Sequence, residues 1–247
     1  MSTVPLKHMD AVSLAERVKA GDVRAVSRLI TLLENQDTVG TVALQRLGGF
    51  SMRAVVIGIT GYPGAGKSTL IDQLTVAYRR QGKKVGIVAV DTTSPITGGA
   101  ILGDRIRMSG HSLDEGVFIR SMATRGQQGG LARATRGTVQ ALDAAGYDVI
   151  LVETVGVGQN EVDIADVAQT VVAVVAPGLG DEVQAMKAGL LEVAHLVVVN
   201  KGDRDGADAT VRDLSAWGYR VMRTVATTGE GVPELMAAIA THGEAGP

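Results

Sequence analysis

Three glycines, a lysine and two hydroxyl residues follow an apolar run near residue 60. The order of this segment is Gly61-Tyr62-Pro63-Gly64-Ala65-Gly66-Lys67-Ser68-Thr69. It matches Gly-x-x-x-x-Gly-Lys-Ser/Thr, a pattern that binds nucleotide phosphates when a strand precedes it and a helix follows it. In that setting the backbone N–H groups of the glycine-rich loop and the positive end of the helix surround the β-phosphate. We therefore expect residues 61–69 to bind a nucleoside triphosphate.

Two side chains of this loop have chemistry of their own. Lys67 is expected to bridge the β- and γ-phosphates, and the hydroxyl of Ser68 is expected to bind Mg²⁺. Because Lys67 would also offset charge that develops on the phosphates, we count it as a catalytic candidate.

A second motif, Asn200-Lys201-Gly202-Asp203, follows the apolar run at residues 195–199. GTPases read guanine with Asn-Lys-x-Asp at the end of a strand, where the aspartate accepts hydrogen bonds from N1–H and the exocyclic amine. A site with such an acceptor rejects a base that cannot donate to it. Alone, the tetrapeptide could be a surface turn. Its position two strands after an acidic motif favours GTP over ATP.

The segment from Val225 to Gly231 occupies the place where GTPases carry a Ser-Ala-x loop. In that loop a backbone N–H meets the guanine O6, so Ala226 joins the nucleotide-binding candidates. Val225 stands in place of the usual serine, which makes this element a weaker match.

Acidic side chains follow the strand expected next to the phosphate loop. Asp91 is placed to hold Mg²⁺, directly or through water, and Asp104 could reach the γ-phosphate or the metal, as could Thr97. The alternative is that both aspartates cap helices. Arg105 and Arg107 could stabilise charge in the transition state, although surface salt bridges are the commoner role of such residues.

A third motif, at residues 153–159, begins with Glu153 at the end of the strand expected at 147–153. It occupies the place of the GTPase Asp-x-x-Gly loop, with Glu153 positioning a metal-bound water and the Gly156 N–H sensing the γ-phosphate. Many GTPases orient the attacking water with a glutamine directly after that glycine, but this chain has Val157 there and Gln159 two residues later. We therefore predict slow hydrolysis that a partner accelerates.

The elements that must position these residues follow from the hydrophobic pattern. Short apolar runs alternate with helical segments from residue 54 onwards, which is typical of a doubly wound, mostly parallel α/β sheet. We expect strands at residues 54–60, 84–90, 117–121, 147–153, 170–176, 195–200 and 220–224. We expect helices at residues 67–81, 101–108, 131–145, 182–191, 209–217 and 233–240.

Residues 1–50 are expected to form a short helical N-terminal extension to a nucleotide-binding domain at 51–247. Within residues 10–35 the apolar spacing predicts two short helices, with a break at Gly21-Asp22. Residues 35–51 are expected to be a mixed connector, and the tail at 241–247 is expected to fray.

Composition excludes several classes of protein. The 247 residues carry 24 basic and 26 acidic side chains and no cysteine, which argues against disulfides, a thiol nucleophile and a nucleic-acid-binding surface. There is no apolar run of membrane-helix length and no signal-peptide core, so we expect a soluble cytoplasmic protein that binds neither membranes nor nucleic acid. The four histidines lack metal-ligand spacing, and His195 is expected to be structural.

Longer segments resemble the MeaB-type GTPases, also called the MeaB/ArgK-like family, which are chaperones of adenosylcobalamin-dependent acyl-CoA mutases. The resemblance is carried by residues 14–22, 28–34, 91–108, 153–159 and 180–189. It implies a P-loop fold of the SIMIBI kind, a mutase as protein partner, and nucleotide and Mg²⁺ roles for Lys67, Ser68, Asp91, Asp104 and Glu153. It also implies a third switch at 178–187, with Asp181, Glu182, Gln184 and Lys187.

Two departures from the family pattern affect what is carried over. Asp91 is followed by Thr92-Thr93 where the family more often has Pro-Ser, which keeps the carboxylate but relaxes the backbone. Family members commonly continue into a helical arm that builds a homodimer. This chain stops soon after Ala240, so we expect no such arm, and a homodimer stays open.

The sequence thus predicts a Mg²⁺-dependent GTPase, with GTP and GDP as ligands, that gates cofactor loading and protection on a mutase. Three alternatives stay open: a metal-insertion GTPase, a P-loop phosphotransferase or transport-linked ATPase, and a GTP-binding module without turnover. The group that positions the attacking water is also open among Asp104, Gln159 and a residue of the partner.

Overall fold

The computed structural model describes residues 10–49, 53–91, 109–111, 113–123, 130–154, 164–178 and 191–244. Seven strands form one sheet in the order β3-β2-β4-β1-β5-β6-β7, and all neighbouring strands run parallel. The strands are β1 (Val55–Gly61), β2 (Val85–Asp91), β3 (Val117–Ala123), β4 (Val149–Thr154), β5 (Thr170–Val175), β6 (Leu196–Val199) and β7 (Val221–Arg223). All seven predicted strands are therefore confirmed, and the fold is a doubly wound α/β sheet.

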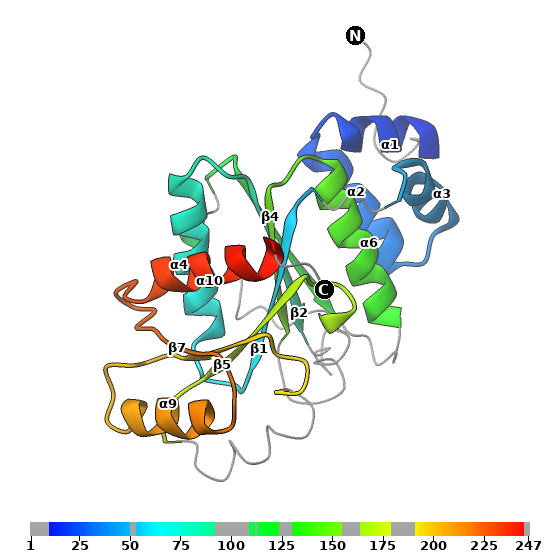
Figure 1. Cartoon of the computed structure of the whole chain (residues 1–247). Helices are drawn as coiled ribbons and strands as arrows, with labels where there is room; N and C mark the ends of the chain where they lie inside the picture. Colours follow the sequence, from blue (N-terminus) through cyan, green and yellow to red (C-terminus); the bar gives the residue numbers. More distant parts are fainter. Residues whose placement is uncertain are drawn as a thin grey trace.

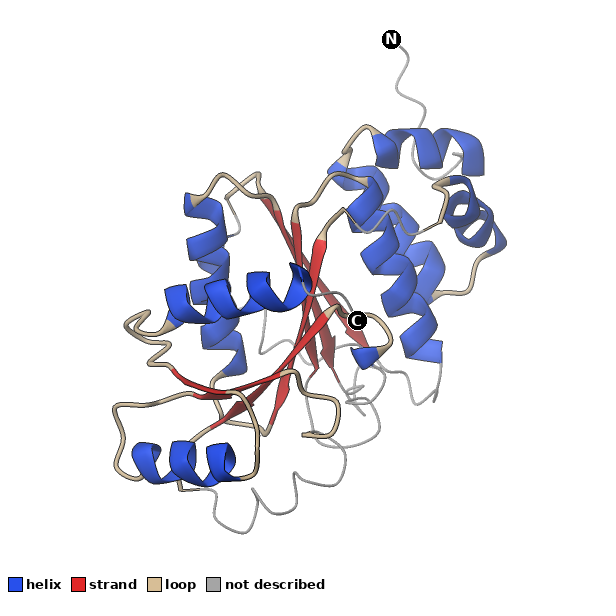
Figure 2. Ribbon diagram, in the orientation of Figure 1, coloured by secondary structure: helices blue, strands red, loops and turns tan. Residues whose placement is uncertain are grey.

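Helices cover both faces of this sheet, as Figure 2 shows with the strands fanned between two helical layers. The helices are α1 (Ala11–Lys19), α2 (Val23–Glu34), α3 (Thr38–Arg46), α4 (Lys67–Arg80), α6 (Gly130–Ala144), α9 (Ala207–Ala216) and α10 (Val232–Glu244), with a 3-10 turn η2 (Ser109–His111). Helices α4 and α10 lie on one side of the sheet, and α2 and α6 lie on the other (Figure 1).

Alternation along the strands divides the core between the two faces. In β5, Val172 and Val174 belong to the cluster under α4 and α10, whereas Ala173 and Val175 pack with the residues of α9. The strands β4, β5 and β6 are buried along their whole length, as expected for parallel strands covered on both sides.

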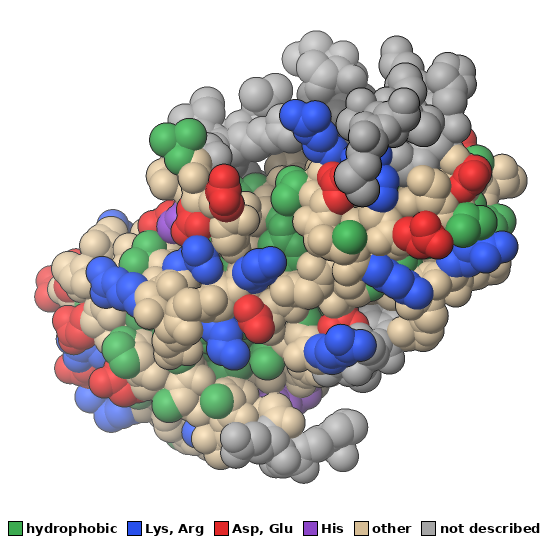
Figure 3. All heavy atoms as spheres, turned by 90° about the horizontal axis from the view of Figure 1, so that it is seen from above, with side chains coloured by type: hydrophobic (Ala, Val, Ile, Leu, Met, Phe, Trp, Pro, Cys, Tyr) green, Lys and Arg blue, Asp and Glu red, His purple; other side chains and the backbone are tan. Residues whose placement is uncertain are grey.

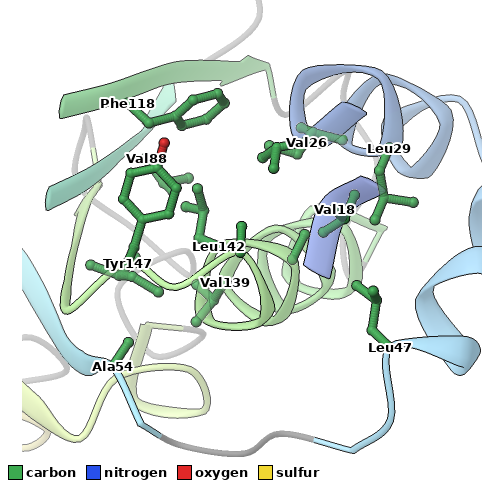
Figure 4. Packing of buried hydrophobic residues seen from close by; sticks show 14 of the residues in the cluster. Val18, Val26, Leu29, Leu47, Ala54, Val88, Phe118, Val139, Leu142 and Tyr147 are labelled. Carbon is green, nitrogen blue, oxygen red and sulfur yellow. The ribbon is translucent and has the colours of Figure 1, made fainter. Parts of the chain in front are cut away.

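The N-terminal helices share a hydrophobic cluster with the sheet. Side chains from α1, α2 and α6 converge on those of β2, β3 and the start of β4, with Leu29, Leu142 and Val88 all fully buried (Figure 4). Gln140 of α6 also donates from Nε2 to the backbone oxygen of Leu44, 3.3 Å away. The N-terminal helices therefore pack on α6 and share one hydrophobic cluster with the sheet.

Aspartates cap all three helices of the extension. Asp10, Asp22 and Asp37 each accept a hydrogen bond from a backbone N–H in the first turn, which satisfies groups that the helix itself leaves unpaired. The expected mixed connector at 35–51 is therefore wrong over Thr38–Arg46. Gly40 lets α3 approach α2 closely, because a Cβ there would lie 2.7 Å from the Cβ of Leu32.

Two further expectations concern the C-terminal part of the chain. Helix α10 continues to Glu244, so the tail is not frayed from residue 241. Nδ1 of His195 accepts a hydrogen bond from the Val171 N–H at 2.9 Å, which confirms a structural role at the end of the sheet where β5 and β6 begin.

The helix expected at 101–108 and all but the last residue of the helix expected at 182–191 lie outside the described residues. Within the described part of the chain, none of the helices is long and apolar enough to cross a membrane. Figure 3 shows basic and acidic side chains interspersed on the face of the molecule seen from above.

Candidate functional site

The predicted motifs meet at the edge of the sheet where the parallel strands end. Ile59 of β1 lies beside Glu153 of β4, and on the other side of β4 Ala89 of β2 pairs with the same glutamate. The turn that begins at Asn200 follows β6 at this edge. Ligands of open α/β sheets bind in the crevice at this edge.

Glycines shape the loop between β1 and α4. Gly61 has φ 139° and its backbone packs so closely on β5 that a Cβ would lie 2.1 Å from the Val174 carbonyl oxygen. Gly66 has φ 95° and directly precedes the first residue of α4. The first N–H groups of a helix have no partner within it, so this loop directs donors and the positive helix end toward one point. A helix N-terminus preceded by a glycine-rich loop is a typical binding site for an anion.

Lys67 brings a positive charge into the same loop. Its side chain is buried, and Nζ donates to the carbonyl oxygens of Gly61 at 2.7 Å and Tyr62 at 3.1 Å. The ammonium group is therefore held inside the turn that the pattern assigns to phosphate.

Hydroxyl and carboxylate oxygens meet beside the loop. Oγ of Ser68 donates to Oε1 of Glu153 at 2.9 Å, and Glu153 is buried. At the next position, Oγ1 of Thr154 donates to Oγ1 of Thr60 at 3.0 Å. The structure thus brings together Ser68 and Glu153, which the sequence places 85 residues apart.

Asp91 closes β2 at the same edge, next in line after the paired residues Val90 and Thr154. Its side chain lies outside the described part of the structure. The same holds for the whole of several residues singled out in the sequence, which are Thr97, Asp104, Arg105, Arg107, Gly156, Val157, Gln159, Asp181, Glu182, Gln184 and Lys187.

Asn200 is a bridge that the sequence argument did not foresee. Its Nδ2 donates to the carbonyl oxygen of Ala65 in the phosphate loop at 2.9 Å. Its Oδ1 accepts from Oγ1 of Thr224 at 3.1 Å and from the N–H of Ala226 at 3.0 Å. One buried amide therefore joins the loops that follow β1, β6 and β7, and a Cβ at Gly66 would lie 2.4 Å from its Nδ2.

The neighbours of Asn200 in the tetrapeptide have different surroundings. Lys201 adopts φ 56° and its Nζ donates to the carbonyl oxygen of Gly64 at 2.6 Å, so it lies along the outside of the phosphate loop. Asp203 is exposed.

Ala226 lies close to this network, as expected, but its N–H is used by Asn200. The loop around it is held by an antiparallel bridge between Val225 and Glu230, and Gly231 at φ 77° makes the turn. A guanine O6 would therefore meet the Ala226 N–H only by sharing it with Asn200.

Comparisons with known proteins identify relatives of this chain. The family described as "Methylmalonyl Co-A mutase-associated GTPase MeaB" matches residues 26–246. A Pyrococcus horikoshii relative is 54% identical over 242 residues, which are 93% of this chain and 76% of that protein. The Escherichia coli "GTPase ArgK" is 34% identical over 252 residues, covering 94% and 76%.

Solved structures give the same fold. The crystal structure of a protein described as "LAO/AO transport system kinase" superposes with a TM-score of 0.75 at 27% identity, over 98% of this chain and 76% of that chain. The family match at residues 26–246 includes the phosphate loop and the tetrapeptide at 200–203.

Proposed function

Because this chain belongs to the MeaB family of GTPases, we propose that it is a Mg²⁺-dependent switch that gates adenosylcobalamin loading and protection on an acyl-CoA mutase. The observation that carries the proposal is the match of the family over residues 26–246 together with the joined phosphate and base-reading loops. The family description names methylmalonyl Co-A mutase, so that enzyme is the first partner to test.

In this proposal, one end of the site binds the phosphates of GTP and the other end binds the guanine base. The loop at residues 61–69 and Lys67 hold the phosphates, and Asp203 selects guanine by accepting hydrogen bonds from the base. The Asn200 amide supports this assignment, since it fixes the distance between the phosphate loop and the tetrapeptide.

The oxygen donors beside the phosphate loop fit Mg²⁺. Mg²⁺ prefers hard oxygen ligands and keeps several waters, and a serine hydroxyl next to a buried carboxylate supplies such a set. Ser68 would bind the ion, with Glu153 and Asp91 holding it directly or through water. When bound, the ion would offset negative charge on the phosphates.

Hydrolysis is proposed to be slow until a partner completes the site. Lys67 holds charge at the phosphates, and Glu153, through its contact with Ser68, is placed to orient a water. Val157 stands where a glutamine orients the attacking water in many GTPases. Asp104, Gln159 or a residue of the mutase would take that role.

The decisive experiment measures GTP hydrolysis by the purified protein, alone and with each adenosylcobalamin-dependent acyl-CoA mutase of its organism, with ATP as control. Slow turnover specific for GTP that one mutase accelerates would support the switch. Equal use of ATP would contradict guanine selection. A rate that no mutase changes would contradict the partner assignment and leave the GTPase.

A further inference from the structure

Gly202, the variable position of the base-reading tetrapeptide, lies under the side chain of Arg223. A Cβ there would lie 2.6 Å from Cγ of Arg223, 2.7 Å from its Nε and 3.1 Å from its Cδ. The φ of Gly202 is not in the left-handed region that favours glycine. The Arg223 side chain therefore packs directly over the backbone of Gly202, and a larger residue at this position would have to displace it.

Arg223 reaches Gly202 from the neighbouring strand. It is the last residue of β7 and pairs with Val199 of β6, the residue before Asn200. The N–H of Gly202 donates to the carbonyl oxygen of Thr224 at 2.9 Å, so the turn and the end of β7 are also joined through the backbone. The aliphatic stem of Arg223 thus lies across the turn that carries Asp203.

The far end of the Arg223 side chain contacts α9. Its Nη1 donates to Oδ1 of Asp208 at 3.0 Å, in the first turn of that helix. Helix α9 and β7 lie side by side (Figure 1). Both side chains are exposed, so the ion pair contributes little energy, and the packing of the aliphatic stem over Gly202 is the stronger contact.

We propose that Arg223 is a positioning residue for the guanine base, which packs over Gly202 and is tied to Asp208 so that Asp203 keeps its place at the base edge. The inference rests on the proposed reading of guanine by Asp203. It predicts an effect on base affinity and base discrimination, with no effect on the chemistry at the phosphates.

The test compares dissociation constants for GDP and IDP, because inosine lacks only the 2-amino group that Asp203 would accept from. In R223A we expect GDP affinity to fall about tenfold and the preference for GDP over IDP to fall toward that of D203A. KM for GTP should rise with kcat unchanged. R220A is the matched control, since Arg220 is exposed just before β7 and should leave both constants unchanged.

A second pair of variants tests the contact itself, and G202A alone keeps the test decisive if R223A folds poorly. In G202A the new methyl group must displace the Arg223 stem, whereas in G202A/R223A the same methyl group enters the space that the stem has left. We expect G202A to weaken GDP binding in the wild-type background and to improve it in the R223A background. Such a change of sign is a direct sign of contact between two residues. Additive effects would overturn the proposal.

The outcomes separate this inference from the function on which it rests. If the wild type fails to prefer GDP over IDP, or if D203A does not alter that preference, the proposed reading of guanine fails. If the wild type and D203A behave as expected but R223A keeps the full preference, only the role of Arg223 is overturned.

Discussion

Asp203 and Asn200 lie three residues apart, and we expect them to have different roles. Asp203 is exposed and is the proposed acceptor for the base, whereas Asn200 is buried and links three loops of the folded chain. Substitutions at the two positions should therefore separate base choice from the shape of the site.

The change D203N should exchange the preferred base. An asparagine offers a donor where the aspartate offers an acceptor, so it should accept from N1–H and donate to the C2 carbonyl of xanthine. We expect the ratio of XDP to GDP affinity to rise about 10- to 100-fold, from the 1–3 kcal/mol cost of an unpaired buried group. Titrations with both nucleotides check this, and an unchanged ratio would remove Asp203 from the base site.

The change N200A should damage the fold as well as nucleotide binding. It leaves the Ala65 carbonyl, the Thr224 hydroxyl and the Ala226 N–H without the partner that they share. We expect the free energy of unfolding to fall by about 2–4 kcal/mol, together with a loss of GDP affinity. Denaturant unfolding and GDP titration measure the two effects. S215A, at an exposed serine of α9, should change neither.

Among the elements, long buried strands were the most predictable part of this chain. Runs such as Val171–Val175 have no polar alternation, so they fit only a strand covered on both faces, and all seven strands were placed within a few residues. The motifs at their ends gave the phosphate loop and the tetrapeptide as local patterns.

Elements held together by tertiary contacts were less predictable. Helix α3 is short, contains Gly40 and four β-branched residues, and packs on α2, so its local helical pattern is weak. The Asn200–Ala65 contact spans 135 residues, and no local pattern encodes it. The Gly202–Arg223 contact was missed for the same reason, because a glycine in a turn has an ordinary local explanation.

The end of α4 and the turn before β3 are joined by an ion pair that should respond to acid. Arg79 donates to both carboxylate oxygens of Asp114, at 2.8 and 2.9 Å, and this hydrogen bonding holds the pKa of Asp114 below its usual value. A carboxyl with a lowered pKa stabilises the folded state above the pKa of the unfolded chain, and this contribution is lost as the pH falls through the folded-state pKa.

In D114N we therefore expect about 1 kcal/mol less free energy of unfolding at pH 7, and a difference from the wild type that shrinks as the pH falls below about 4. Urea unfolding across that pH range measures it. D213N, at an exposed aspartate of α9, is the control and should stay parallel to the wild type. A difference for D114N that is constant with pH would mean that the carboxylate charge does not matter.

The whole molecule is built so that the N-terminal helices and the sheet share one hydrophobic cluster. Leu29 of α2 is fully buried within it. We expect L29A to lower the free energy of unfolding by about 2–5 kcal/mol. V12A, at an exposed position of α1, should have little effect.

The single tryptophan makes this test specific. Trp217 packs beside β5 and β6, in a different cluster from Leu29, so its fluorescence reports the sheet while circular dichroism reports all helices. If the expected boundary at residue 50 does not separate two folding units, the unfolding transitions of L29A followed by fluorescence and by circular dichroism should shift together. A fluorescence transition that stays in place would show that the extension unfolds alone.

The strand order also has a consequence for how the protein is made. The strand that leads into the phosphate loop lies between β4 and β5, so its partners end at residues 154 and 175, and the loop is joined to Asn200 later still. During synthesis the apolar residues of this strand stay uncovered until β4 and β5 have been made. Chaperones that hold nascent chains should therefore be engaged early, and GTP can stabilise the chain only after synthesis has passed Asn200.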